Sequence, residues 1–350
     1  MRFVHIADVH LGAKPDAGPL YSKMRPRELW ESFEQVLRVC EEEKTDLLLI
    51  AGDLFHRQPL VRELKEAGYL FSELTHTKVV LIAGNHDYIG KDSNYRTFSW
   101  SDNVYPLFGR KMQCADFPEL QTAVYGLSYH EREISRPLYD GIRAPGRRRH
   151  EILLAHGGDE KHIPFDRRLM EKAGFDYVAL GHIHKPQVLK EDQIIYSGAL
   201  EPVDKNDTGR HGYVKGEITD QGVRTQWIPC ASREYIHLQI PVSCQDTTGS
   251  LKKKICEQIS EYGNENIYKI ILNGKRDQNV SLDTERMTGD ENIQEILDET
   301  SPAYDFEKLY TENEDTILGR YIGRFRGCRE GSVEYRALCE GVEALLNCRQ

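Results

Sequence analysis

The stretch Ala83-Gly84-Asn85-His86-Asp87 follows directly on an apolar run, KVVLI at 78–82. An apolar run rich in β-branched residues that stops at a glycine predicts a buried strand, and the polar residues after it predict a functional loop. Four other apolar runs also lead into residues able to bind a metal ion: 4–7 before DVH at 8–10, 46–50 before GD at 52–53, 152–155 before HG at 156–157, and 177–180 before GHIH at 181–184.

The segments between these runs predict helices that alternate with strands. Apolar side chains recur every three or four residues over 27–43 and again over 61–74, as in amphipathic helices. Strands and helices in this order predict an α/β fold with right-handed crossovers and covered sheet faces. In such sheets functional groups gather at the strand ends, where every candidate ligand falls. Further elements are expected as a helix at 164–174 and strands at 122–126, 151–155, 193–196 and 212–218.

Seven residues at these strand ends have the side chains of metal ligands. They comprise two carboxylates, four imidazoles and one amide: Asp8, His10, Asp53, Asn85, His156, His182 and His184. This mixture suits manganese, iron or zinc and is too rich in nitrogen for calcium or magnesium. Seven ligands are too many for one ion, so we expect two divalent ions that share a central carboxylate such as Asp53. Two metals about 3.5–4 Å apart activate a bridging hydroxide and clamp the oxygens of an in-line phosphoryl displacement.

His86 is adjacent to a ligand and is expected to face the scissile phosphate, where it would stabilise developing charge or protonate the leaving oxygen. Asp87 is expected to hold the other ring nitrogen of His86. His56 follows a ligand loop and is left undecided, and the remaining histidines are interpreted as ordinary ones: His5, His76, His130, His162, His211 and His237. A single DxH or GD after a strand is more often structural, but five such loops in this order have no packing explanation.

Composition limits the classes of protein. The 350 residues carry a formal net charge of −10, which is atypical of proteins that coat nucleic acid, so any nucleic-acid contact is expected from local patches. No apolar run approaches the roughly 18 residues of a membrane span, and the first residues lack the apolar core of a signal peptide. The eight cysteines are scattered without a CxxC pair, which favours reduced thiols and a cytoplasmic location.

A basic loop, IRAPGRRRH at 142–150, precedes one of the predicted strands. Its proline and glycine are typical of a solvated turn. Alternatively its arginines contact the phosphate backbone of DNA. The candidates for that contact are Arg143, Arg147, Arg148 and Arg149.

The pattern changes near residue 230. Strands at 236–242 and 268–272 and helices at 251–259 and 292–299 predict a small α+β unit. Beyond 302, two apolar stripes predict short amphipathic helices, the second with Ser332 as its N-cap. Such a helical pair either packs on its own domain or binds a partner.

The motifs DVHLG, GDLFH, GNHD, HG and GHIH resemble those of the calcineurin-like metallophosphoesterases, in particular the SbcD-like DNA-repair nuclease branch. YVALGHIHK and YSGALEP, followed by RHGY, strengthen the nuclease branch over phosphatase branches. The resemblance implies a four-layer α/β/β/α sandwich at 1–230, a small α+β capping domain at 231–302 and a short helical segment at 303–350. It also implies a homodimer, two manganese ions, and an SMC-like ATPase partner of the SbcC type.

By the same resemblance, each ion has four protein ligands and His86 is the catalytic histidine. One ion is held by Asp8, His10, Asp53 and His184, and the other by Asp53, Asn85, His156 and His182. Because the chain ends soon after the expected cap, a partner-binding tail would be short.

These features predict a two-metal-dependent DNA exonuclease or endonuclease that acts in DNA repair. The same metals would also support a phosphodiesterase or phosphatase that acts on a small molecule or a protein. A DNA-end-binding subunit with little catalysis is a third alternative. It is disfavoured because such a subunit needs neither all seven ligands nor His86.

Overall fold

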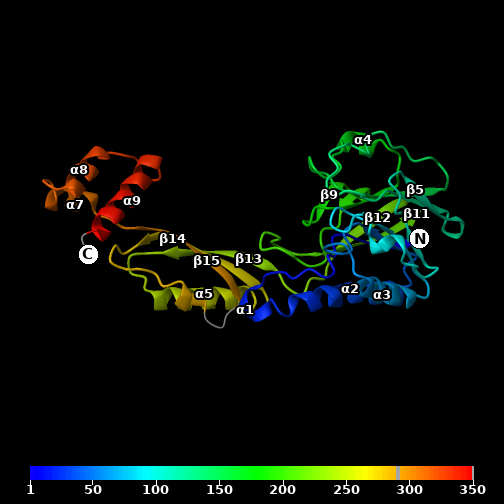
Figure 1. Cartoon of the computed structure of the whole chain (residues 1–350), viewed down its shortest axis with the longest axis horizontal. Helices are drawn as coiled ribbons and strands as arrows, with labels where there is room; N and C mark the ends of the chain where they lie inside the picture. Colours follow the sequence, from blue (N-terminus) through cyan, green and yellow to red (C-terminus); the bar gives the residue numbers. More distant parts are fainter. Residues whose placement is uncertain (289–291, 349–350) are drawn as a thin grey trace. The chain divides into compact units, whose positions relative to one another are not determined.

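The computed structural model describes residues 1–288 and 292–348 (Figure 1). The chain forms two compact units, the first from Met1–Ile236 with Glu265–Ile267 and the second from His237–Asn264 with Tyr268–Gln350. The predicted domain limits at 231 and 303 stay predictions. In the described residues, no helix is both long enough and apolar enough to cross a membrane.

The first unit contains two six-stranded sheets. The first sheet has the order β12-β11-β1-β2-β3-β4, in which the neighbours from β1 to β4 pair in parallel and β11 and β12 continue the sheet antiparallel. Its strands are β1 (Arg2–Ile6), β2 (Leu47–Ala51), β3 (Lys78–Ile82), β4 (Val104–Pro106), β11 (Gly212–Thr219) and β12 (Gly222–Pro229).

The second sheet has the order β5-β6-β7-β8-β10-β9. Its four central strands are parallel, and β5 and β9 close the two edges antiparallel. The strands are β5 (Gln113–Phe117), β6 (Thr122–Gly126), β7 (His150–His156), β8 (Tyr177–Gly181), β9 (Gln187–Lys190) and β10 (Ile194–Tyr196).

Successive side chains of each strand point to opposite faces of the sheet, and this divides the core into layers. On β2, Leu48 and Ile50 pack toward helices α2 (Arg25–Glu42) and α3 (Val61–Ser72), while Leu47 and Leu49 join the core that also contains β7 and β8 residues. Because successive side chains of a strand point to opposite faces, a strand buried on both faces reads as an unbroken apolar run. The predicted sandwich of two sheets between outer layers is confirmed.

The outer layer of the second sheet is only partly helical. The predicted helix at 164–174 is shorter in the structure, as α4 (Arg167–Glu171). It begins where the Asp166 carboxylate caps it by accepting from the backbone N–H groups of Arg168 and Leu169. Loops complete this layer around Met170 and Phe175. The remaining short helices of the first unit are α1 (Gly18–Tyr21), η1 (Asn94–Arg96) and η2 (Pro118–Leu120).

In the three-stranded sheet β13-β14-β15, one expected element is wrong. Residues 292–299 were expected as a helix, whereas β15 (Ile293–Pro302) pairs in parallel with β14 (Ile267–Arg276). Glutamate, glutamine and leucine favour a helix locally, but pairing with β14 at nine positions outweighs that propensity. The other elements of this part are β13 (Tyr235–Val242), α5 (Thr248–Tyr262) and α6 (Glu285–Thr288).

The predicted C-terminal helices are present as α8 (Ile317–Arg324) and α9 (Val333–Asn347), preceded by α7 (Phe306–Glu312). The Ser332 side chain accepts from the Tyr335 N–H at 3.1 Å, which confirms the N-cap. The two apolar stripes pack on each other through Leu318, Ile322, Leu338 and Val342. Binding of a partner by these helices stays a prediction.

Candidate metal centre

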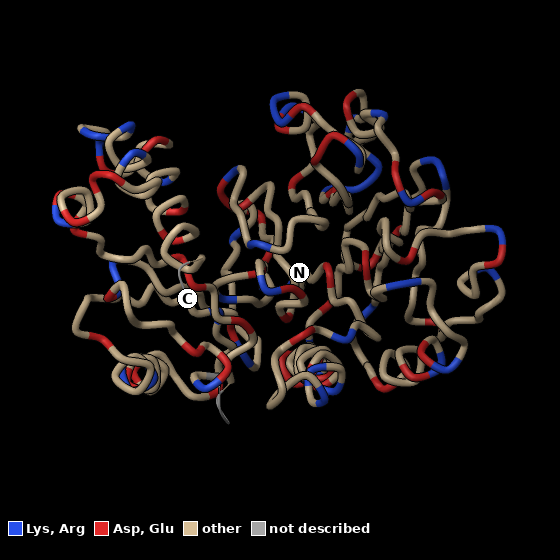
Figure 2. Tube along the Cα trace, turned by 60° about the vertical axis from the view of Figure 1, so that its left-hand side comes forward, with Lys and Arg blue, Asp and Glu red and all other residues tan. Residues whose placement is uncertain are grey.

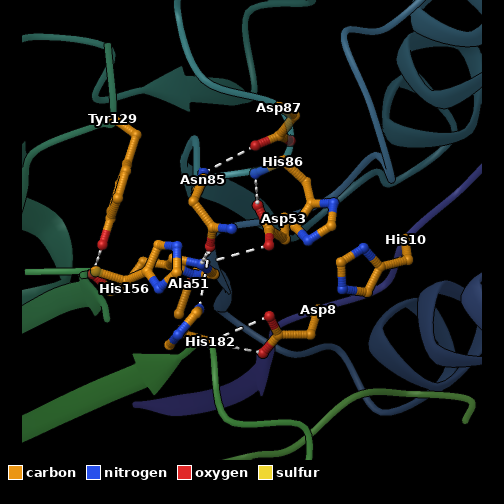
Figure 3. Close-up of polar contacts among 12 residues, drawn as sticks. Asp8, His10, Ala51, Asp53, Asn85, His86, Asp87, Tyr129, His156 and His182 are labelled. Carbon is orange, nitrogen blue, oxygen red and sulfur yellow. Dashed lines mark hydrogen bonds and ion pairs between the residues drawn. The ribbon is translucent and has the colours of Figure 1, made fainter. Parts of the chain in front are cut away.

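All seven predicted ligands come from the loops that follow five parallel strands of the first unit or from the last residue of those strands. Asp8 and His10 follow β1, Asp53 follows β2, Asn85 follows β3, His156 ends β7, and His182 and His184 follow β8. Figure 3 shows most of these side chains pointing toward one another. Both sheets therefore contribute to one polar cluster, as the strand-end pattern predicts.

The backbone at this cluster has an uncommon conformation. Asp8, His10, Asp53 and His182 have positive φ angles of 51°, 52°, 51° and 96°. A side chain disfavours this conformation, so it persists only where surrounding bonds hold it. The N–H groups of Asp8 and His10 donate to the carbonyls of Gly52 and Asp53, both at 3.1 Å. Strain held in this way is typical of functional sites.

Two glycines of the ligand loops let the chain approach closely. A Cβ atom at Gly84 would overlap the Asp53 carboxylate. A Cβ at Gly52, which has a φ of +95°, would overlap the His156 ring. The glycines of the AGD and AGNHD motifs therefore make room for the polar cluster itself.

Four acceptor atoms converge around Asn85. The Nδ1 of His156 faces the Ala51 carbonyl at 2.9 Å, so in the neutral ring Nδ1 carries the proton and the lone pair lies on Nε2. That Nε2 is 2.9 Å from the Asn85 Oδ1 and 3.4 Å from the Asp53 Oδ2. On the other side, the His182 Nδ1 lies 3.0 Å from the same Asn85 oxygen. Burial and the nearby His156 lower the pKa of His182 to about 4, so this ring is neutral.

A second pair of imidazoles lies around Asp8. The His184 Nδ1 donates to the Asp207 Oδ2 at 2.9 Å, which leaves the lone pair of the neutral ring on Nε2. That Nε2 is 3.0 Å from the His10 Nε2. Ligand atoms of Asp8, His10 and His184 all lie within 4.8 Å of one another.

Lone pairs that face lone pairs repel unless a cation lies between them. In the metal-free chain a proton can serve as that cation: burial would lower the pKa of His156, but the ionised Asp53 outweighs burial and raises that pKa to about 9. Burial also opposes protonation of His184, yet its contact with Asp207 raises its pKa to about 9. The cluster therefore attracts positive charge, and its donor set of imidazole, carboxylate and amide oxygen fits divalent transition metals.

Two buried carboxylates are candidates for a shared ligand. The ligand atoms of Asp8, Asp53 and His156 also lie within 4.8 Å of one another, so Asp8 belongs to both groups. Asp8 accepts the His182 N–H at 2.9 Å, and Asp53 accepts the His86 N–H at 2.9 Å. The sharing of Asp53 between two ions stays a prediction, and the geometry adds Asp8 as a second candidate.

His86 lies at the edge of this cluster, 4.8 Å from His10 between ring centroids. Its Nδ1 donates to the His56 carbonyl at 2.9 Å, which orients Nε2 as the free nitrogen of the ring. The undecided His56 thus supports His86 through its backbone, while its own Nδ1 is 3.4 Å from the His10 Nδ1.

The expected contact of Asp87 with the His86 ring is wrong, because the His56 carbonyl occupies that position. The Asp87 carboxylate instead accepts from the Gly84 N–H at 2.8 Å, the Phe55 N–H at 3.2 Å and the Tyr95 hydroxyl at 2.8 Å. Burial, followed by the nearby Asp53, raises the pKa of Asp87 to about 7. Asp87 therefore ties two ligand loops together.

The basic loop lies at the other end of β7, about 20 Å along the strand from His156 by the usual rise per residue. Arg147 and Arg148 contact the Asp116 carboxylate at 3.0 and 2.5 Å, and Arg149 contacts Asp220 at 2.6 Å. The fourth arginine, Arg143, donates to the Ile142 carbonyl. These partners favour the solvated turn, and DNA contact stays a prediction.

Two carboxylates that hold site histidines were not identified from the sequence. Asp159 lies 2.7 Å from the His182 Nε2, and Asp207 holds the ring of His184. His162, interpreted as an ordinary histidine, also contacts Asp159. Asp159 could have been identified from its position in the loop after His156. Asp207 follows no strand-end pattern, so the sequence offers no comparable sign of its role.

Known proteins resemble this chain. The profile of the calcineurin-like phosphoesterase family matches residues 1–186, which include all seven candidate ligands. The chain is 28% identical over 242 residues to the uncharacterized metallophosphoesterase YhaO of Bacillus subtilis, across 63% of this chain and 58% of that protein.

Two archaeal relatives share one name, DNA double-strand break repair protein Mre11. The chain is 30% identical over 222 residues to that of Methanocaldococcus jannaschii, across 59% of this chain and 58% of the relative. It is 23% identical over 346 residues to that of Halobacterium salinarum, across 91% and 84%. In the matches to YhaO and to the Methanocaldococcus protein, the chain spans less than two thirds of the relative's length.

Proposed function

This chain belongs to the calcineurin-like phosphoesterase family, and we propose that it is a two-metal-dependent DNA nuclease, SbcD-like, that hydrolyses phosphodiester bonds in DNA repair. The observation that carries the proposal is the convergence of lone pairs from His156, His182 and Asn85 on one side and His10 and His184 on the other. Such an arrangement is stable when cations are bound between the acceptors.

The two acceptor groups divide the ligands between two ions. His10 and His184, with Asp8, would hold one ion, and Asn85, His156 and His182 would hold the other, with Asp53 shared. When bound, such a pair lowers the pKa of a bound water and stabilises the charge of an in-line phosphoryl displacement. We propose manganese as the metal, with iron or zinc as alternatives, because imidazole and carboxylate ligands suit all three.

His86 would act on the substrate rather than on the metals. Because the His56 carbonyl fixes its Nδ1–H, its Nε2 is available to a phosphate oxygen or a leaving group. A ring held in this orientation can stabilise developing charge or supply a proton to the departing oxygen. Asp87 would support this role indirectly, by holding the loop that carries His86.

DNA is the favoured substrate because two of the reported relatives are named as DNA double-strand break repair proteins. A phosphodiesterase or phosphatase for a small molecule or a protein is the second candidate, because YhaO is named only as a metallophosphoesterase. A DNA-end-binding subunit with little catalysis is disfavoured by the complete ligand set.

Protein partners are also part of the proposal. We propose a homodimer in the cytoplasm and an SMC-like ATPase of the SbcC type, with α8 and α9 as the candidate contact. If the full chain and a chain lacking 312–350 bind the ATPase equally, the helices serve only packing. Weaker binding by the shortened chain, with an unchanged dimer and unchanged nuclease activity, would support the contact.

The function is tested with the purified full chain and Mn²⁺ on four substrates: labelled single-stranded DNA, labelled double-stranded DNA, a bis-aryl phosphodiester and a phosphomonoester. Cleavage of DNA supports the nuclease, and turnover of the monoester alone supports the phosphatase. Asp53→Ala is the control for a contaminating nuclease, because its preparation should cut neither DNA.

A further inference from the structure

The two histidines of the GHIH segment are held by opposite ring nitrogens. His182 has its Nε2 on a carboxylate, Asp159 at 2.7 Å, and turns Nδ1 toward Asn85. His184 has its Nδ1 on a carboxylate, Asp207 at 2.9 Å, and turns Nε2 toward His10. A carboxylate only accepts, so each of these contacts fixes where the ring carries its proton.

Asp159 is itself held by the loop after β7. It accepts the backbone N–H groups of Lys161 at 2.8 Å and His162 at 2.9 Å, and the His162 Nδ1 at 2.9 Å. The His162 ring lies 4.5 Å from the His182 ring between centroids. The Asp159 side chain nevertheless remains 46% exposed, so it stands at the solvent side of His182.

Asp207 is held by a different loop and is more enclosed. It accepts the Val203 N–H at 3.0 Å and the Asp204 N–H at 3.2 Å, and its side chain is 15% exposed. Asp159 and Asp207 thus lie in separate segments, and each contacts a histidine of a different acceptor group. Neither belongs to the seven candidate ligands.

We infer that Asp159 and Asp207 are positioning residues, each of which sets the affinity of one of the two metal ions by fixing the tautomer of one histidine. The inference rests on the proposed two-metal function. A carboxylate on the outer nitrogen makes the inner nitrogen a better ligand and holds the ring in place, and loss of such a partner typically weakens metal binding about 10–100-fold. Asp159 would act on the ion next to Asn85, and Asp207 on the ion next to His10.

The test titrates Mn²⁺ into the metal-free full chain by calorimetry and follows Co²⁺ by its visible absorption, which reports the ligand geometry. Asp159→Asn and Asp207→Asn keep the shape of the side chain and an acceptor oxygen but remove the charge. Each variant is expected to weaken one of the two binding steps about 10–100-fold and to leave the other unchanged. The double variant is expected to weaken both.

A second measurement distinguishes an effect of Asp159 and Asp207 on metal binding from a purely structural role. The metal-free melting temperature of both variants should match that of the wild type, while the increase in melting temperature on adding Mn²⁺ should be smaller. Asp220→Asn, which removes a carboxylate paired with Arg149 at the other end of β7, is the matched control and should change neither quantity.

Several outcomes would overturn the inference alone. One is that both binding steps are unchanged in both single variants. Another is that either variant weakens both steps equally. A third is that the metal-free melting temperature falls while the increase in melting temperature on adding Mn²⁺ stays unchanged. A third wild-type equivalent that disappears in Asp159→Asn would show that Asp159 and His162 bind an ion themselves. A wild-type chain that binds no ion would instead overturn the proposed function.

Discussion

The two ends of β7 carry charged and polar residues of opposite character. At the amino end, Arg147, Arg148 and Arg149 each have a carboxylate partner. At the carboxyl end, the acceptor atom of His156 faces other acceptors. Figure 2 shows residues of both signs interspersed along the chain.

The difference teaches that pairing, and not charge, separates a structural region from a functional one. Exposed ion pairs contribute little to stability, because water and salt screen them. Buried acceptors without donors destabilise the fold unless something positive is bound. We therefore expect substitutions at the carboxyl end to remove function and those at the amino end to have little effect.

The largest effect is expected for Asp53→Ala. Because Asp53 is the proposed shared ligand, this variant should lose more bound metal than any other single ligand substitution and should cut DNA below detection. Metal content is measured by elemental analysis beside Asp8→Ala, since Asp8 also belongs to both groups. Two full equivalents in Asp53→Ala would contradict the sharing, and a greater loss in Asp8→Ala would transfer it to Asp8.

His86→Ala should separate binding from chemistry at the same end. We expect unchanged metal content and DNA affinity with turnover lowered about 10²–10⁴-fold, the usual range for acid–base or electrostatic groups. His86→Asn should recover little, because an amide cannot supply an imidazolium proton. Single-turnover cleavage, DNA binding and metal content are measured on one preparation. Near wild-type cleavage, or the loss of one metal equivalent, would refute this role.

A pair of glycine substitutions compares the two regions without changing charge. Gly84→Ala places a methyl group against the Asp53 carboxylate, whereas Gly141→Ala, just before the basic loop, meets no atom within 4 Å. A displacement of about 1 Å at a reacting centre can cost about 10²-fold in rate. We expect a loss of that order for Gly84→Ala and none for Gly141→Ala. Equal activity of the two variants would show that the ligand loops adapt.

The candidate ligands at the carboxyl ends of the strands could be predicted, because each ligand ends its strand or follows it within a few residues. The expected and observed strands agree fully at 78–82 and 122–126. Contacts made by loops could not be predicted in this way. Asp207 lies 23 residues from His184, and Asp87 is turned away from its neighbour His86 toward the backbone of Gly84 and Phe55.

The segment after residue 230 was less predictable because packing there competes with local preference. Residues 293–302 have a helix-favouring composition and form a strand, since β14 supplies a ladder that no sequence window reveals. The apolar stripes of α8 and α9 were identified correctly, but the pattern did not show that they pack on each other. Periodicity identifies an apolar face and leaves its partner open.

The smallest effect is expected at the amino end of β7. Because Asp116 and Asp220 already pair with its arginines, a variant with Arg147, Arg148 and Arg149 all changed to Gln should retain DNA affinity within about twofold. Each arginine that contacts phosphate adds about 0.9 to the slope of log affinity against log salt, so the measured slope should also stay unchanged. Arg143→Gln is measured as a separate variant, because the Arg143 guanidinium donates to a backbone carbonyl rather than to a carboxylate.

A slope reduced by about 2 or more in the triple variant, with metal content unchanged, would show that these arginines leave their carboxylates to bind DNA. Pairing would then be a poor guide to function at this end of the strand.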